Sequence, residues 1–454
     1  MNRNGRGRDI RLRAVTTCAA VAIAMGGSIA VASGTQAVVT PAPRTFEPTG
    51  HEQVYTVPEG VTLVETDVNG ADGGGGSLGM PLGGYLAVSG GEKLYVEVGV
   101  NGSYGGGATF GGGGTAGAIP LTLGVKPCTG IDAAGSCGGA LAGSGGGASD
   151  IRSCSERAAS CPGGGTDASR LEVAGGGAGY GGGGESPGWY CTQLPQKGFG
   201  YNPQPLPHGN PAQGPVPIRT AAGLVIPGRP ADWSYGEIKD VTASQGGSTK
   251  PGAGGALGTC SVNETNNGSV IAETYGRSLR GAPGNGPDGG PGTAVTGHFE
   301  LEVPGNWIPG AGGGGGGGYT GGGGGSTGAV CIYSVKGPPC NDPSGGMGGG
   351  GGSSFAASQV LQPFVQDGPA SGPSIVVTPI VEIDSPRNGA VYRSGQVVDA
   401  QWACGHYQGT SCGSATAAPG SPIDTKPGKH TFSIKVSLYP DNADVTSSVT
   451  YTVR

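Results

Sequence analysis

Long runs of glycine are the feature that most restricts how this chain can fold. The longest runs occupy 312–318, 321–325 and 348–352, and shorter ones recur from position 73 onward. Ordering glycine costs more conformational entropy than ordering any other residue, so a glycine-rich run is commonly a flexible linker. A collagen triple helix is excluded, because it needs glycine at every third position and these glycines are consecutive.

Two interpretations of the runs compete, a free linker and a packed structure. The runs are almost pure glycine, strand-like segments such as 171–174 and 298–303 lie between them, and cysteines stand at their borders. Extended glycine segments with three residues per turn can bond laterally, because no side chain keeps them apart. We therefore expect an all-β chain in which the glycine runs are ordered and packed as polyglycine-II-type helices.

The N-terminus has the order of a secretory signal peptide. Five arginines between positions 3 and 13 precede an alanine-rich apolar stretch, and small residues suited to cleavage follow at 30–32 and 35–37. We predict a signal peptide over 1–37 and a secreted or cell-surface location. An uncleaved membrane anchor is the alternative, but the stretch is weakly apolar for a spanning helix of about 20 residues.

The charge of the remaining chain argues against nucleic-acid partners. The whole chain has 25 basic and 31 acidic residues, and removing the five arginines and Asp9 of the leader leaves a formal net charge of −10. Nucleic acids and anionic membranes both require clustered Lys and Arg. We expect a protein or a glycan as the partner class, and a membrane contact only if the leader stays uncleaved.

Cysteine usage also predicts export. Ten cysteines remain after Cys18, four pairs of them are close along the chain, and an even number in an exported protein indicates disulfides. Zinc is the rival use, but no Cys-x-x-Cys spacing occurs. The disulfide candidates are Cys128 with Cys137, Cys154 with Cys161, Cys331 with Cys340, Cys404 with Cys412, and Cys191 with Cys260.

The first part of the mature chain is predicted to be a glycine-rich domain over 38–361. Its beginning alternates like a β-meander, with a hairpin expected between 85–88 and 94–98 because a Gly-Gly turn separates them. A Pro- and Asn-rich insertion at about 185–291 is expected to be a surface loop.

The last part is predicted to be a separate small β-sandwich over 380–454, after a linker at 362–379. Its composition is ordinary, and 430–436 and 447–453 alternate with period two. Trp402 alternates into a strand and is expected in the core.

Both parts resemble known families. The segments that carry the first resemblance are Val68-Asn69-Gly70-Ala71, Ala148-Ser149-Asp150-Ile151-Arg152, Leu171-Glu172-Val173-Ala174 and Ser353-Ser354-Phe355, each beside glycine runs. In this order they are similar to the glycine-rich domain of anaplastic lymphoma kinase-type receptors and of exported bacterial proteins. That resemblance implies a β-scaffold with a bundle of glycine helices, which in the receptors is part of the ligand-binding region. The chain has no kinase motif, so we expect no kinase activity.

The second resemblance lies in the C-terminal part. Residues 384–392, Trp402-Ala403-Cys404 and 428–432 resemble bacterial Ig-like modules of exported proteins. Such modules act as spacers or adhesive units, so the resemblance implies that role here.

No catalytic pattern emerges, and the five histidines are scattered. Asp150 and Arg152 should share a strand face and form a structural ion pair. We expect a non-catalytic exported protein with a structural or adhesive function, without a cofactor or a metal. The alternative is a soluble module that binds a protein or glycan through the 185–291 insertion, with Trp189, Tyr190 and Trp233 as candidate contact residues.

Overall fold

The computed structural model describes residues 41–75, 77–119, 141–161, 166–182, 217–231, 238–239, 243–256, 259–260, 271–275, 279–295, 299–300, 306–307, 310–328, 330–334, 340–343, 346–366, 372–405 and 409–454. The chain divides into two units, Met1–Ala37 and Val38–Arg454. The expected signal segment lies outside the described residues, so the architecture below is that of the second unit. No helix in the described part is long and apolar enough to cross a membrane.

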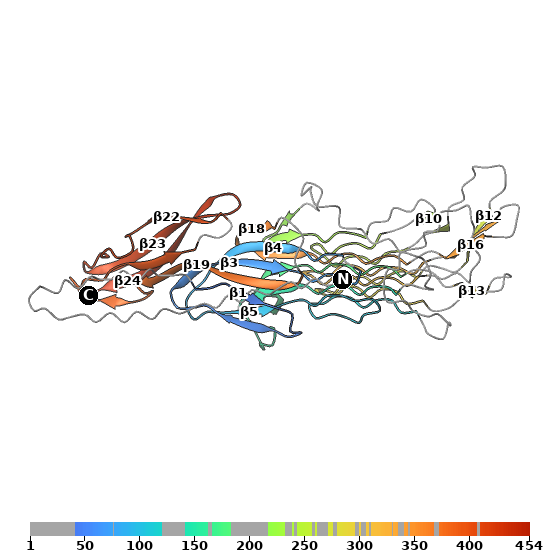
Figure 1. The fold of residues 1–454 in the computed structure, drawn as a ribbon, viewed down its shortest axis with the longest axis horizontal. Coiled ribbons are helices and arrows are strands. Elements are labelled where there is room, and N and C mark those ends of the chain that lie inside the picture. Colours follow the sequence, from blue (N-terminus) through green and yellow to red (C-terminus); the bar gives the residue numbers. More distant parts are fainter. Residues whose placement is uncertain are drawn as a thin grey trace, which may run out of the picture. The chain divides into compact units, whose positions relative to one another are not determined.

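Three large sheets confirm the predicted all-β class (Figure 1). The central sheet has the order β1 (Arg44–Phe46), β19 (Ser374–Ser385), β3 (Val61–Asn69), β4 (Pro81–Ala87) and β18 (Leu361–Val365), and β21 (Gln401–Cys404) pairs with β19. The outer sheet has the order β2 (Gln53–Thr56), β5 (Lys93–Glu97), β6 (Ser149–Arg152), β7 (Arg170–Ala174), β17 (Ser354–Ala357), β9 (Gly223–Ile226) and β8 (Ile218–Arg219). The C-terminal sheet has the order β20 (Val391–Tyr392), β24 (Ala443–Val453), β23 (Gly428–Leu438) and β22 (Ser411–Ala415).

Three small sheets complete the described strands. They are β10 (Ile238–Lys239) with β11 (Thr259–Cys260), β12 (Ile271–Tyr275) with β15 (Val330–Ser334) and β16 (Cys340–Pro343), and β13 (Phe299–Glu300) with β14 (Asn306–Trp307). A short 3-10 helix, η2 (Thr166–Ser169), precedes β7.

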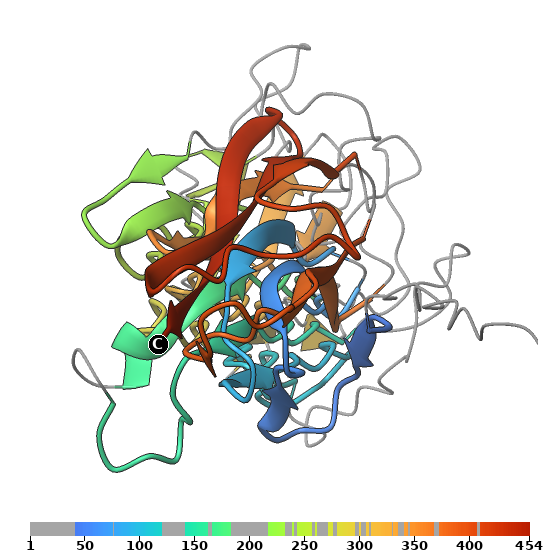
Figure 2. The same cartoon turned by 90° about the vertical axis from the view of Figure 1, so that its left-hand side faces the viewer.

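The central sheet is buried on both faces. On one face, Val64 and Ile375 share a hydrophobic core with Ile151 of the outer sheet. On the other face, Leu63 packs with Phe432 of the C-terminal sheet, whose red strands lie in front of the blue central strands in Figure 2. Eight of the nine residues of β3 are therefore buried, although four of these eight, Glu65, Thr66, Asp67 and Asn69, are polar.

The central and outer sheets are stacked face to face. Beyond the ends of their strands, they converge until their backbones touch. Facing sheets stand about 10 Å apart where side chains fill the space. Gly70 directly follows β3 and Gly175 directly follows β7, and the Met80 amide donates to the Gly175 carbonyl at 2.9 Å. A Cβ added at Gly70 would lie less than 3.0 Å from the same carbonyl oxygen. The close approach of two backbones therefore requires glycine here.

The glycine-rich segments bond laterally to one another, and we call them together the glycine array. Its members are 70–74, 99–117, 143–148, 175–182, 244–255, 281–293, 310–328 and 346–353, drawn in Figure 1 as extended traces that continue from the strands. Donors three residues apart reach the same neighbouring segment. In the run 312–318, Gly313 and Gly316 donate to Met347 and Gly350, Gly314 and Gly317 to Gly143 and Gly146, and Gly315 and Gly318 to Gly290 and Pro287, all at 2.8–3.0 Å.

Part of the insertion belongs to this array, so the expectation of a surface loop over 185–291 is wrong for 244–255 and 281–291. The amides of Gly323 and Gly324 donate to the carbonyls of Gln245 and Ala282. The small residues of these stretches allow the close approach that the neighbouring glycine run needs.

The predicted hairpin between 85–88 and 94–98 is also wrong in its pairing. Both strands form, but β4 pairs with β3 and β18, whereas β5 pairs with β2 and β6. The turn between them connects the two stacked sheets. Leu86 and Leu94 therefore meet through their side chains in the core between the sheets and not through backbone hydrogen bonds.

Most of the segment predicted as a linker, 362–379, forms strands of the central sheet. β18 pairs with β4, and β19 runs through the predicted domain boundary at 379–380 without a break. The physical reason is that β19 has apolar residues for both cores. Val377 contributes to the core against the outer sheet, and Ile383 contributes to the core against the C-terminal sheet.

Two of the predicted short disulfide loops are closed. Cys154 bonds Cys161 and Cys404 bonds Cys412, with Cα–Cα distances of 5.8 and 6.3 Å. The register of β15 and β16 places Cys331 opposite Asp342 and Cys340 opposite Tyr333. Cys128, Cys137 and Cys191 lie outside the described residues, as do the side chains of Cys260, Cys331 and Cys340.

A side chain inside the glycine array should destabilise the fold. A Cβ at Gly315 would lie less than 3.0 Å from the carbonyl of Gly322, so Gly315→Val should lower the free energy of unfolding by about 3 kcal/mol or more. Nothing lies within 4 Å of a Cβ at Gly107, so Gly107→Ala should change it by less than about 0.5 kcal/mol. Denaturant unfolding measures both, and equal effects would contradict the close packing.

Candidate functional site

The sequence-predicted contact residues are not brought together by the described structure. Trp189, Tyr190 and Trp233 lie outside the described residues. Trp402 is half-buried beside the core under the C-terminal sheet, and its Nε1 donates to the Ala417 carbonyl at 3.0 Å. This agrees with its expected place in a core.

A buried charged cluster lies where β5, β6 and β7 run side by side. Arg152 contacts Asp150 at 3.0 Å and Glu97 at 2.8 Å, which confirms the predicted Asp150–Arg152 pair and extends it. Arg170 contacts the other oxygen of Asp150 at 2.9 Å, and its Nη1 donates to the Gly318 carbonyl in the glycine array at 3.2 Å. All four side chains are at least nine-tenths buried, so each charge depends on its partners.

Glu97 is the incompletely bonded carboxyl of this cluster, and Arg170 Nε also has no hydrogen-bond partner among the described residues, although it lies within ion-pair distance of Asp150. Its Oε2 accepts from Arg152, whereas Oε1 has no hydrogen-bond partner among the described residues when the carboxyl is ionised. Burial, followed by a hydrogen bond with the Glu156 carboxyl, raises the pKa of Glu97 to about 9. The same hydrogen bond lowers the pKa of Glu156. Of the two carboxyls, Glu97 is therefore the one that keeps its proton at neutral pH.

An open cavity of about 650 Å³ is lined by this cluster. Glu97, Arg152 and Arg170 form its buried lining, and the glycine segment 111–114 lies beside them. Three exposed carboxylates, Glu156, Asp167 and Asp288, also line it. With Asp150, five carboxyls surround the guanidinium groups of Arg152 and Arg170, and the exposed Arg157 is a third guanidinium, which helps to lower the pKa of Glu156. The site therefore has more negative than positive charge.

Sequence reasoning found only Asp150 and Arg152 of this site. Glu97 and Arg170 join them through sheet pairing, in which Glu97 lies opposite Asp150 and Arg170 opposite Arg152. Asp288 comes from the segment that was expected to be a surface loop. The one local signal was the acid–base alternation of 150–152.

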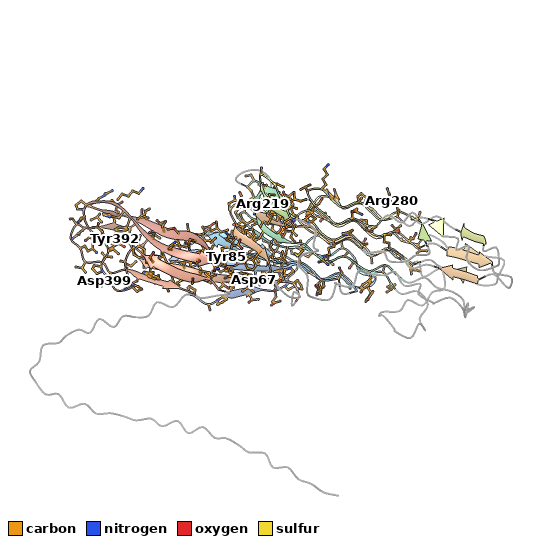
Figure 3. All side chains as sticks on the ribbon, turned by 90° about the horizontal axis from the view of Figure 1, so that it is seen from above. Asp67, Tyr85, Arg219, Arg280, Tyr392 and Asp399 are labelled. Atoms are coloured by element: carbon orange, nitrogen blue, oxygen red, sulfur yellow. A yellow bond between two sulfur atoms is a disulfide. The ribbon has the colours of Figure 1, made fainter. Side chains whose placement is uncertain are left out.

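A second set of buried carboxyls lies in the sheets and lines no described cavity. Glu65 is fully buried, neither of its oxygens has a partner among the described residues, and burial followed by nearby Asp67 raises its pKa to about 8. Burial also raises the pKa of Glu172 to about 8, although Thr66 donates to it at 2.8 Å. Figure 3 labels Asp67 beside Tyr85, on neighbouring strands of the central sheet.

No protein-family model matches this chain, and no curated protein matches it in sequence. In the described part of the chain, no three His, Cys, Asp or Glu side chains are placed to hold a metal ion together. The cavity at Glu97 is thus assigned as the candidate site from its own geometry and charge.

Stability should fall as pH rises from about 5 to 9. The folded pKa values of Glu65 and Glu172 are about 8 and that of Glu97 about 9, whereas the reference value is 4.5. The folded state holds these protons more tightly, so their stabilisation is complete below about pH 4.5 and is lost as pH rises through 8 to 9. Each group should contribute about 1.4 kcal/mol per pH unit to the decline in the free energy of unfolding.

Denaturant unfolding at several pH values tests this expectation. Glu172→Gln keeps an acceptor for Thr66 and removes one titrating group, so the decline should become shallower by about 1.4 kcal/mol per pH unit. Asp441→Asn, at an exposed carboxylate, should leave the decline unchanged. A stability that rises between pH 5 and 9 would show that these groups are ionised in the fold.

Proposed function

We propose that this protein is an exported structural or adhesive protein, secreted or held at the cell surface, in which the glycine array is a rigid framework. The observation that carries the proposal is the threefold order of the array's hydrogen bonds. Residues three apart donate to the same neighbour, as in Gly313 with Gly316 and Gly314 with Gly317. Three residues per turn is the repeat of a polyproline-II-like helix, which has no internal hydrogen bonds.

A helix without internal bonds must find all its backbone partners in neighbouring segments. Each turn of the run 312–318 is bonded in three directions, which restrains a chain that would otherwise be the most flexible. Such an array offers rigidity and a defined surface, the properties that a spacer or an adhesive body needs. We infer that its segments are polyglycine-II-type helices, in agreement with the resemblance to the glycine-rich receptor domains.

The packing of the C-terminal part also supports a spacer or adhesive role. The C-terminal sheet packs on the core face shared by β19, and β21 pairs with the end of that strand. We propose that this arrangement is an Ig-like sandwich that shares β19 with the central sheet. Its disulfide and Cys154–Cys161 are compatible with an extracellular protein. A soluble module that binds through Trp189, Tyr190 and Trp233 stays a prediction.

Cell fractionation tests export. We expect the chain outside the cytoplasm, with an intact mass that lacks about the first 37 residues and no uptake of a thiol-alkylating label unless reductant is added. A chain that lacks residues 1–37 from the start should remain in the cytoplasm and take up the label. A full-length, labelled chain in the cytoplasmic fraction would contradict the proposal.

Limited proteolysis of the purified, unreduced protein tests the framework. Cleavage requires local opening, so a fragment that retains 310–328 should survive a broad-specificity protease. Gly315→Val should lose this resistance, and Gly107→Ala should keep it. Rapid digestion within 310–328 of the unaltered protein would refute a rigid array.

A further inference from the structure

Carboxyl groups predominate among the charged groups that line the cavity at Glu97. The cavity is open, about 650 Å³ in volume, and lined by carboxyls from three separate parts of the chain. Both buried guanidinium groups are engaged, since Arg152 contacts Glu97 and Asp150, and Arg170 contacts Asp150 and a backbone carbonyl. Arg157 is a third guanidinium that acts on Glu156, but it is exposed to solvent, which screens its charge. The surplus carboxyls are Glu156, Asp167 and Asp288. A cationic ligand would therefore meet an attractive field.

Glu97 supplies the specific acceptor. Its side chain is only 5% exposed, it lines the cavity, and its Oε1 has no donor among the described residues in the ionised form. A buried carboxylate oxygen without a donor is costly, and an N–H group that binds it gains a charge-assisted hydrogen bond. Glu156 lies beside it as a second acceptor. Because both carboxyls line the cavity, an N–H cation with several donors can contact both of them.

Phe110 adds an apolar surface to the same cavity. It is half-buried and belongs to the lining, beside the glycine segment 111–114 that keeps the wall free of side chains. A planar guanidinium can stack on an aromatic ring while its N–H groups contact carboxylates in its own plane. This combination of a ring with paired carboxyls suits an arginine side chain.

We propose that the Glu97 cavity binds the cationic side chain of a partner protein, arginine in preference to lysine, with Glu97 and Glu156 as the acceptors. The inference deepens the proposed function by naming the chemistry of the partner, and it rests on the protein meeting that partner outside the cytoplasm. Export and protease resistance do not depend on Glu97, so the two proposals fail separately.

Binding should exchange one cation for another. The incoming N–H groups take the place of the proton on Glu97, and that proton passes to solvent, so charge balances. Because the pKa of Glu97 is about 9, affinity should rise about tenfold per pH unit between pH 6 and 8.5. About one proton per bound ligand should be released at pH 7.

Calorimetry with the full mature chain and the short peptide Ac-Gly-Arg-Gly-NH2 is the test. The pH dependence of the affinity, and the heat in buffers of different ionisation enthalpy, give the proton release. The matched peptide with citrulline, which is neutral and of the same shape, should not bind. Binding of the citrulline peptide with equal affinity, or no binding of the arginine peptide at millimolar concentration and pH 8.5, would overturn the proposal.

Variants separate binding from folding. Glu97→Gln keeps an acceptor for Arg152 and removes the charge, so the peptide should bind at least about tenfold more weakly and release no proton. Asp288→Asn, on the exposed lining, should weaken binding severalfold without changing the thermal unfolding, and Asp441→Asn should change neither. Unaltered binding by Glu97→Gln would overturn the site. Tighter binding of free spermidine than of the arginine peptide would overturn the assignment to a protein side chain.

Discussion

Lateral hydrogen bonding between glycine backbones is the interaction on which the rest of this structure depends. Each glycine segment has to find its partners in other segments, and the donors of one run are divided among three neighbours. No single run could be stable alone, because glycine loses the most conformational entropy on ordering. The array therefore forms only if other parts of the fold bring its segments together in register.

The sheets provide that register. Segments of the array lead directly into β6 and β17 and follow directly from β3 and β7, so the pairing of the strands sets the alignment of the glycines. Side chains hold the central and outer sheets apart, and where side chains end at Gly70 and Gly175 the backbones close on each other. The strands of the β-scaffold and the segments of the glycine array therefore belong to one continuous fold.

The candidate site lies at this transition. Glu97 is the last residue of β5, and Arg170, the first of β7, reaches the array through the Gly318 carbonyl. Ion pairs at this depth contribute little net stability, but they fix the positions of charged groups that would otherwise be solvated. The guanidinium groups paired with Asp150 and the incompletely bonded Glu97 leave an acidic cavity beside a wall without side chains. The geometry of this cavity follows from the change from side-chain packing between the sheets to backbone packing in the glycine array.

Local patterns in the sequence were sufficient for the all-β class, for strands such as 430–436 and 447–453, for two closed disulfide loops and for the Asp150–Arg152 pair. Each depends on residues close along the chain, where periodicity and short loops carry the information. The tertiary structure alone decided that β4 and β5 belong to different sheets, that 362–379 is mostly strand, and that Glu97 and Arg170 join the charged cluster. These outcomes depend on partners distant along the chain. Glycine runs carry no side-chain pattern that could identify such partners, so only the packed sheets determine which segments meet.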